Sequence, residues 1–211
     1  MAGYFDASDE ASEICRRLLV NIKNAQSNYL SMDSFLASIS DSAAAADAGA
    51  DATTSLKPFA ARSNPFNAAT RSNFRRIHDR HSSILHAIKS SHGKVARKLR
   101  LARAVRRSRT GSLLRLQEQL DTAAKGTYVL GRDLDTVSHL VARLSDGIER
   151  ENAMARCCAE RFPVQEMVNQ LSRSYSRWRK LAEELEEHVC LCLATIQRAR
   201  VLVITEISKQ A

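Results

Sequence analysis

The chain has 211 residues, enough for one domain with a hydrophobic core, and contains only 7 glycines and 3 prolines. Aromatic residues make up 5% of the sequence, which argues against a β-sandwich and favours helices packed through aliphatic side chains. The net charge of +9 favours an acidic partner, such as nucleic acid, anionic lipid or an acidic protein surface. No apolar run approaches the roughly 20 residues that a membrane-spanning helix needs, so no spanning segment is expected.

The first predicted helix spans residues 6–39, with Asp6 or Ser8 as its N-cap. Apolar and small residues recur from Ala11 to Ile39 at alternating steps of four and three, which places them on one face that packs against another helix. Residues 40–69 are rich in Ala, Ser and Asp and lack such a face, which predicts a flexible linker.

Three further helices are predicted over residues 71–107, 112–159 and 163–208, each with the same seven-residue apolar repeat. Short connections join them, so neighbouring helices are expected to run antiparallel. The predicted fold is therefore all-α, an elongated antiparallel four-helix bundle with long heptad-patterned helices, in a single domain over residues 1–211. The alternatives are an open pair of helical hairpins and a homodimer of hairpins. A monomer is favoured, because the four apolar faces can cover one another.

Two features interrupt the third apolar repeat. Glu151 is its one charged member. Gly126, Gly131 and Gly147 are each expected to weaken this helix by roughly 1 kcal/mol relative to alanine.

The second predicted helix carries the strongest chemical feature, a basic amphipathic stretch in its last third. Such a face can follow the phosphates of a membrane surface, where each cation contributes about 1 kcal/mol. The alternative is a solvated face that the acidic residues of the fourth helix balance. Nucleic acid ranks lower, because neither an aromatic stacking platform nor a known DNA-reading motif accompanies the charge. The candidate anion-binding residues are Lys94, Arg97, Lys98, Arg100, Arg103, Arg106, Arg107 and Arg109.

Two other groups of residues have the side chains of a metal site or an acid–base site. His188, Cys190 and Cys192 suggest zinc, but Cys190 points away from the other two on a helix and no second pair stands at zinc-finger spacing. His78, Asp79 and His81 suggest acid–base chemistry, but no activated nucleophile stands near them in the sequence. Because His81 lies on the apolar face of the second helix, a half-buried, hydrogen-bonded histidine is expected there instead. The five cysteines are expected to be reduced, buried thiols of an intracellular protein. No catalytic residue, metal or cofactor is predicted.

Several segments together resemble a known family, in the family's order and over nearly the whole chain. They include FDASDEASEICRRLL (5–19), FRRIHDRHSSILHAIKS (74–90), LDTAAKGTYVLGRDLDTVSHLVARLSDGIER (120–150) and LEEHVCLCLATIQRARVLVITEI (185–207). This pattern resembles the plant uncharacterised protein family 0496, whose members include integrin-like proteins described as linking membrane and cytoskeleton. The resemblance implies a plant source, a helical fold and no known reaction.

The chain departs from that family at one place. Family members commonly carry an apolar, membrane-spanning stretch between the basic helix and the LDTAAKG segment, and here residues 106–112 lead almost directly to Leu113. Membrane spanning by that stretch is therefore not implied for this chain. A natural member without the insert and a chain from which it has been removed remain alternatives.

These observations predict a non-enzymatic helical scaffold or adaptor with an unidentified protein partner. We expect it in the cytoplasm, either free or peripheral to anionic membranes through the basic helix. The alternative is a nucleic-acid-binding helical protein that uses the same helix.

Overall fold

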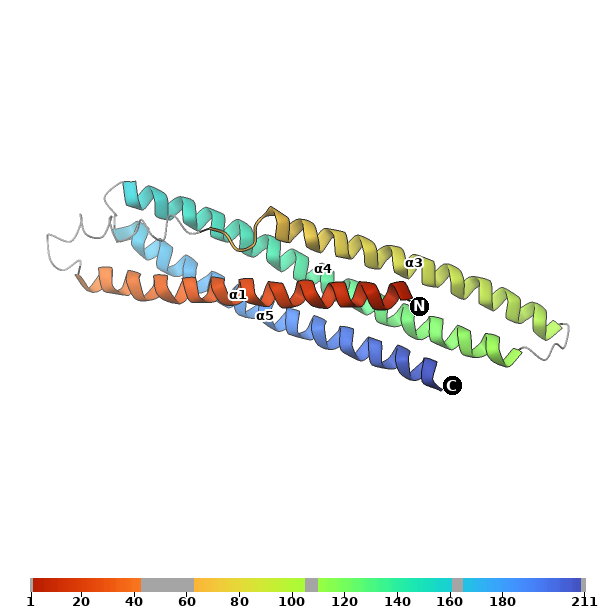
Figure 1. Cartoon of the computed structure of the whole chain (residues 1–211). Coiled ribbons are helices and arrows are strands. Elements are labelled where there is room, and N and C mark those ends of the chain that lie inside the picture. Colours follow the sequence, from red (N-terminus) through yellow and green to blue (C-terminus); the bar gives the residue numbers. More distant parts are fainter. Residues whose placement is uncertain (1, 43–62, 105–109, 161–164, 210–211) are drawn as a thin grey trace. The chain divides into compact units, whose positions relative to one another are not determined.

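The computed structural model describes residues 2–42, 63–104, 110–160 and 165–209. These ranges contain four helices and no strand (Figure 1). The helices are α1 (Ala2–Ser42), α3 (Ala68–Ala104), α4 (Thr110–Glu160) and α5 (Gln165–Ser208).

The helix ends differ from the expected ones by a few residues. Ser8 does not cap α1, which begins at Ala2; its buried hydroxyl instead donates to the carbonyl of Phe5 at 2.8 Å, within the helix. The predicted linker at 40–69 is helical at both ends, because α1 continues to Ser42 and α3 begins at Ala68. Its residues 43–62 lie outside the described ranges.

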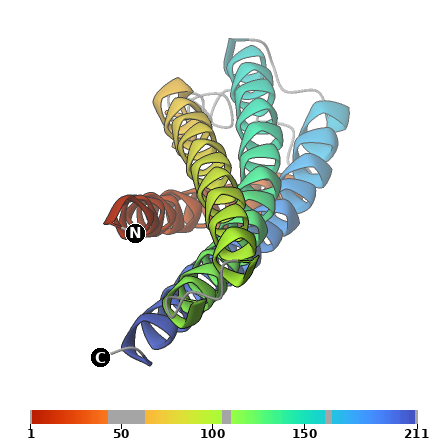
Figure 2. The same ribbon diagram turned by 90° about the vertical axis from the view of Figure 1, so that its right-hand side faces the viewer.

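The helices pack into two compact units. Unit 1 contains Met1–Arg16, Ser72–Val137 and His188–Ala211, and unit 2 contains Arg17–Arg71 and Ser138–Glu187. All four helices contribute to unit 1, and Figure 2 shows them in a view turned by 90°. The predicted all-α, four-helix bundle is confirmed.

Contacts within unit 1 show that the neighbouring helices are antiparallel. Gln119 of α4 donates to the carbonyl of Glu206 of α5. Gly126 comes later on α4, and it lies against Ala199, which comes earlier on α5. Residue numbers therefore rise along α4 as they fall along α5. In unit 2, α1 and α5 follow the same rule, since Gln26 donates to Glu186 at 2.8 Å and Asp33 accepts from Arg179 at 3.3 Å. Each unit is therefore held by faces that meet in a fixed register.

The predicted apolar faces form the core. Of the positions whose side chains the structure describes, every predicted face member of α1 and α5 is buried. Leu116 is an exception on α4, because 39% of it is exposed. The core of unit 1 near this position contains Tyr4, Ile88, Val95, Leu120, Ala123 and Val203.

Candidate functional site

The structure places five of the eight predicted anion-binding residues along the last third of α3, in unit 1, and all five are exposed. They are Lys94, Arg97, Lys98, Arg100 and Arg103. The remaining three, Arg106, Arg107 and Arg109, lie outside the described residues.

The exposed cations differ from two basic residues nearer the start of α3. Nearer the start of the helix, Arg76 and Arg80 both form ion pairs with Glu10 of α1. In the described part of the chain, none of the five has a carboxylate within ion-pair distance; Arg97 donates only to the carbonyl of Gly93, one turn back. Their charge is therefore left facing solvent.

Two of the acidic residues of α5 that could balance this charge have cationic partners elsewhere. Glu186 pairs with Lys23 at 2.6 Å, and Glu183 lies 3.9 Å from Arg179. Both partners belong to unit 2, as do Glu183 and Glu186 themselves. The ion pairs of these two acids are therefore not made with the exposed cations of α3.

Exposed leucines lie among the free cations. Leu101 is 67% exposed and stands one helical turn after Arg97 and Lys98. Where α3 ends and α4 begins, the two helices lie side by side (Figure 1), and α4 adds Leu114 and Leu116. We call this set the basic tip of unit 1: Lys94, Arg97, Lys98, Arg100, Leu101, Arg103, Leu114, Arg115 and Leu116.

A groove of about 660 Å³ runs between the two helices of the basic tip. Arg100 and Arg103 line it from α3, and Leu114 lines it from α4. Glu118 and Asp121 supply acidic groups at its other end, and Asp121 pairs with Lys125 at 2.7 Å. Sequence reasoning missed the α4 side of the tip because it assigned Leu116 to the buried face and did not consider Arg115.

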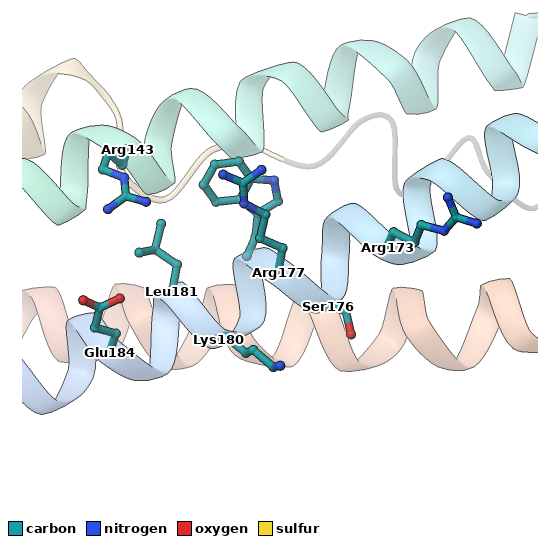
Figure 3. Close-up of a pocket in the computed structure, with 8 residues that line it drawn as sticks. Arg143, Arg173, Ser176, Arg177, Lys180, Leu181 and Glu184 are labelled. Carbon is teal, nitrogen blue, oxygen red and sulfur yellow. The ribbon is translucent and has the colours of Figure 1, made fainter.

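Unit 2 carries a second basic groove, of about 450 Å³, between α4 and α5. Figure 3 shows Arg143 extending from α4 and three cations from successive turns of α5. These are Arg173, Arg177 and Lys180, with Glu184 as the acid in the lining. The guanidinium of Arg177 lies over the Trp178 ring at 5.4 Å from its centroid. This groove lacks the exposed leucines of the basic tip.

The histidine and the cysteines considered as catalytic or metal-binding residues do not form such a site among the described residues. His81 is 2% exposed, not half-buried, and neither ring nitrogen has a hydrogen-bond partner among the described residues. Burial lowers the pKa of His81, and the nearby carbonyl of Ala7 opposes this shift only in part. Cys15 and Cys192 are buried as expected, whereas the expectation of burial is wrong for Cys157 and Cys190, which are exposed. The described residues contain no cluster of three His, Cys, Asp or Glu side chains that could hold a metal ion.

Unit 2 buries the carboxyl group of Glu151, the one charged member of the third apolar repeat. Glu151 of α4 accepts a hydrogen bond from Ser174 of α5 at 2.5 Å through Oε1, while Oε2 has no partner among the described residues. Burial raises the pKa of Glu151 to about 7. Tyr29 of α1 and Tyr175 of α5 line the same small cavity, of about 30 Å³.

Helix α5 is more apolar than expected, since the sequence predicts no segment able to span a membrane. The segment Asn169–Ser208 of α5 contains an 18-residue window with mean hydropathy 1.4 and at most two charged residues, of which 28% is buried. By length and composition this helix is apolar enough to cross a membrane, a test that the core helix of a bundle also passes.

Comparison with known proteins gives relatives from plants. Over 94 residues, 43% of the chain, the sequence is 45% identical to a putative UPF0496 protein 2 of Oryza sativa, and the match covers 23% of that protein. It is 38% identical to a UPF0496 protein of Arabidopsis thaliana over 103 residues, which are 47% of the chain and 26% of the relative. A second Arabidopsis UPF0496 protein is 36% identical over 93 residues, 42% of the chain and 26% of the relative.

The chain thus spans about a quarter of the length of these relatives. No family model matches the chain. No solved structure shows significant similarity to it. The relatives confirm the resemblance to the plant UPF0496 family, and their names state no activity.

Proposed function

We propose that this chain, which resembles the plant UPF0496 proteins, is a non-enzymatic helical scaffold that attaches to anionic membrane surfaces through the basic tip of unit 1. The observation that carries the proposal is the set of exposed α3 cations that have no carboxylate partner among the described residues and surround an exposed leucine. Cations attract anionic headgroups, at about 1 kcal/mol each near the surface, and apolar side chains enter the headgroup boundary.

The leucines favour a membrane over nucleic acid. A duplex presents phosphates and polar base edges, to which Leu101, Leu114 and Leu116 offer no hydrogen bond. Single-stranded nucleic acid is usually held by stacking on aromatic rings, and the basic tip contains none. Cations beside exposed leucines instead match an interface in which headgroups lie next to hydrocarbon.

Replacing Arg97 and Lys98 by glutamine is expected to weaken binding to phosphatidylserine vesicles by roughly ten- to thirtyfold, since two cations contribute about 2 kcal/mol at most. Glutamine keeps the helix propensity of the replaced residues. Flotation of the full chain with phosphatidylserine or phosphatidylcholine vesicles, at low and high salt, measures the effect.

The matched control replaces Arg143 and Arg173, from the basic groove of unit 2, by glutamine and so removes the same charge. We expect this variant to bind like the parent chain. Equal losses in both variants would show that binding follows net charge and not the basic tip. Failure to bind either vesicle at low salt would remove the membrane proposal. Tight binding to duplex DNA with a steep salt dependence would support the nucleic-acid alternative instead.

Replacing Leu101 by glutamine is expected to weaken vesicle binding roughly fivefold, because the apolar contribution of one partly inserted leucine is lost. Leu101 is 67% exposed, so the fold should keep its stability. Leu30 of α1, which is 55% exposed in unit 2, provides the control when replaced in the same way. Co-sedimentation at high salt, where the cations are screened, isolates this apolar contribution, and an unchanged Leu101 variant would exclude leucine insertion.

A further inference from the structure

Two cysteine side chains from distant parts of the sequence meet in the core of unit 1. Cys15 of α1 and Cys192 of α5 are both fully buried, and their Sγ atoms are 3.8 Å apart. At this distance one thiol donates a weak hydrogen bond to the other sulfur. Both occupy the buried faces of their helices, so the packing of α1 against α5 keeps them together.

We propose that Cys15 and Cys192 are a site of reversible oxidation, at which a hydroperoxide converts the two thiols into a disulfide that joins α1 to α5. A disulfide needs an S–S distance of about 2.05 Å, so the sulfur atoms must approach by less than 2 Å. Ala11 precedes Cys15 by one turn on the same buried face, so no large side chain stands beside the pair at that turn of α1.

The surroundings assign different roles to the two thiols. The hydrogen bond with Cys192 is the main cause that lowers the pKa of Cys15; burial opposes the shift, and Arg16 assists it. The pKa of Cys192 is raised by its interaction with Cys15, by burial and by the carboxylate of Asp133 on α4. The charge of Arg16 beside Cys15 and that of Asp133 beside Cys192 both favour Cys15 as the thiolate, which is the form that attacks a peroxide.

The reaction balances with a hydroperoxide as the oxidant. The Cys15 thiolate attacks one peroxide oxygen, the O–O bond breaks, and protonation of the departing oxygen releases water when the oxidant is hydrogen peroxide. Cys192 then attacks the sulfenic sulfur of Cys15, the S–O bond breaks, and a second water leaves with the Cys192 proton. Two thiols and one hydrogen peroxide thus give one disulfide and two waters.

A small oxidant can reach the pair through local opening of α1. Between Tyr4 and Leu18, the buried positions of α1 are Ala7, Ser8, Ala11, Ser12 and Cys15. These side chains bury less apolar area than leucine or isoleucine, so apolar burial opposes separation of this segment from α5 less than it opposes separation of the residues that follow. The ion pair of Asp9 with Arg200 also joins this segment to α5, but the Asp9 side chain is 67% exposed, so the pair adds little to that opposition.

The other cysteines must be removed to make the test specific. Cys157 and Cys190 are exposed, and the side chain of Cys158 lies outside the described positions. A full-length variant with Cys157→Ser, Cys158→Ser and Cys190→Ser keeps Cys15 and Cys192 alone, since the chain has 5 cysteines. Any intramolecular disulfide in that variant must join these two residues.

Treatment of this variant with hydrogen peroxide is expected to remove the mass of two hydrogens and to abolish alkylation of the protein after denaturation without reductant. Because the link closes a long loop, the midpoint of thermal unfolding should rise by roughly 10 °C and return with dithiothreitol. Addition of Cys192→Ser should eliminate both effects, leaving oxidation of single thiols.

Three results would overturn the proposal. The first is a chain that keeps two alkylatable thiols after prolonged oxidation. The second is a disulfide that lowers the unfolding midpoint, since the link would then not fit the folded unit. The third is a rate of disulfide formation that follows global unfolding when urea is varied below the unfolding transition, in place of a rate set by local opening.

Discussion

Replacing Glu151 by glutamine is expected to stabilise the protein at pH 8 by about 3 kcal/mol and to flatten the pH dependence of its stability between pH 5 and pH 8. The cause is the burial of an ionisable group on the packed face of α4. Burial raises the pKa of this carboxyl from 4.5 to about 7, and the hydrogen bond from Ser174 offsets that shift only in part. Glutamine has the same shape and carries no charge at any pH.

The sign of this pH dependence follows from how tightly the folded and the unfolded chain hold the proton of Glu151. Below pH 4.5 the carboxyl is protonated whether the chain is folded or unfolded, and the folded state has no charge to bury. As the pH rises from 4.5 to about 7, the unfolded chain releases this proton while the folded chain holds it, so stability falls. Above about pH 7 both states are ionised and the loss is complete.

The surroundings of Glu151 favour the neutral form. Tyr29 of α1 and Tyr175 of α5 line its cavity without a positive charge, and Arg150 is the cation that partly lowers its pKa. The cavity, of about 30 Å³, has room for a water molecule that a protonated carboxyl or a glutamine amide could bind. Burial also raises the pKa of Tyr29, so its hydroxyl remains neutral throughout the window.

Urea denaturation of the parent chain and the variant at pH 5 and pH 8 measures this effect. Glu187→Gln removes an exposed carboxyl from the same unit and should leave the pH dependence as it is in the parent chain. A parent chain whose stability is the same at both pH values, or an equal effect from Glu187→Gln, would show that Glu151 is not buried as an acid.

The burial of Glu151 could be foreseen in part from the sequence. The repeat of four and three placed it on the packed face of its helix, and the structure leaves it 2% exposed. The repeat could not show that Ser174 and Tyr29 would meet it, because spacing orders residues along one helix and does not tell which turn of another helix lies opposite. The Cys15–Cys192 contact was hidden for the same reason.

The basic tip shows a second limit of sequence patterns. The repeat predicts which residues would face a partner helix, and it continues through Leu113 and Leu116 at the start of α4. The repeat does not tell whether another helix packs against the start of α4; only the folded unit shows this. Leu116 is 39% exposed, and the residues that line the nearby groove all come from α3 and α4. The charges of α3 were predicted correctly as a face, but their lack of carboxylate partners required the structure.

Gly147→Ala is expected to destabilise the protein by about 2 kcal/mol, although alanine is the better helix former by roughly 1 kcal/mol. A Cβ atom at Gly147 would lie 2.6 Å from Cε2 and 2.7 Å from Cδ2 of Trp178, closer than atoms can pack. The ring cannot move aside cheaply. Its Nε1 donates to Ser174 at 3.2 Å, and the Arg177 guanidinium lies over its face.

Gly131 of the same helix provides the matched control, because a Cβ added there would meet no atom within 4 Å. Gly131→Ala should therefore stabilise the protein by roughly 1 kcal/mol, the full difference in helix propensity. From the sequence, both glycines are expected to destabilise the helix equally relative to alanine, because the sequence gives only their helix propensity. Urea denaturation followed by circular dichroism measures the two changes of opposite sign.

A double-mutant cycle separates the clash from other effects of the Gly147 substitution. The chain has 1 tryptophan, so Trp178→Leu removes the ring that the new methyl group would strike. Trp178→Leu will itself destabilise unit 2, because a large buried ring is lost. In that background Gly147→Ala should become neutral or stabilising, which gives a coupling of about 2–3 kcal/mol. Additive losses would mean that Gly147 is required for a reason other than the close approach of α5.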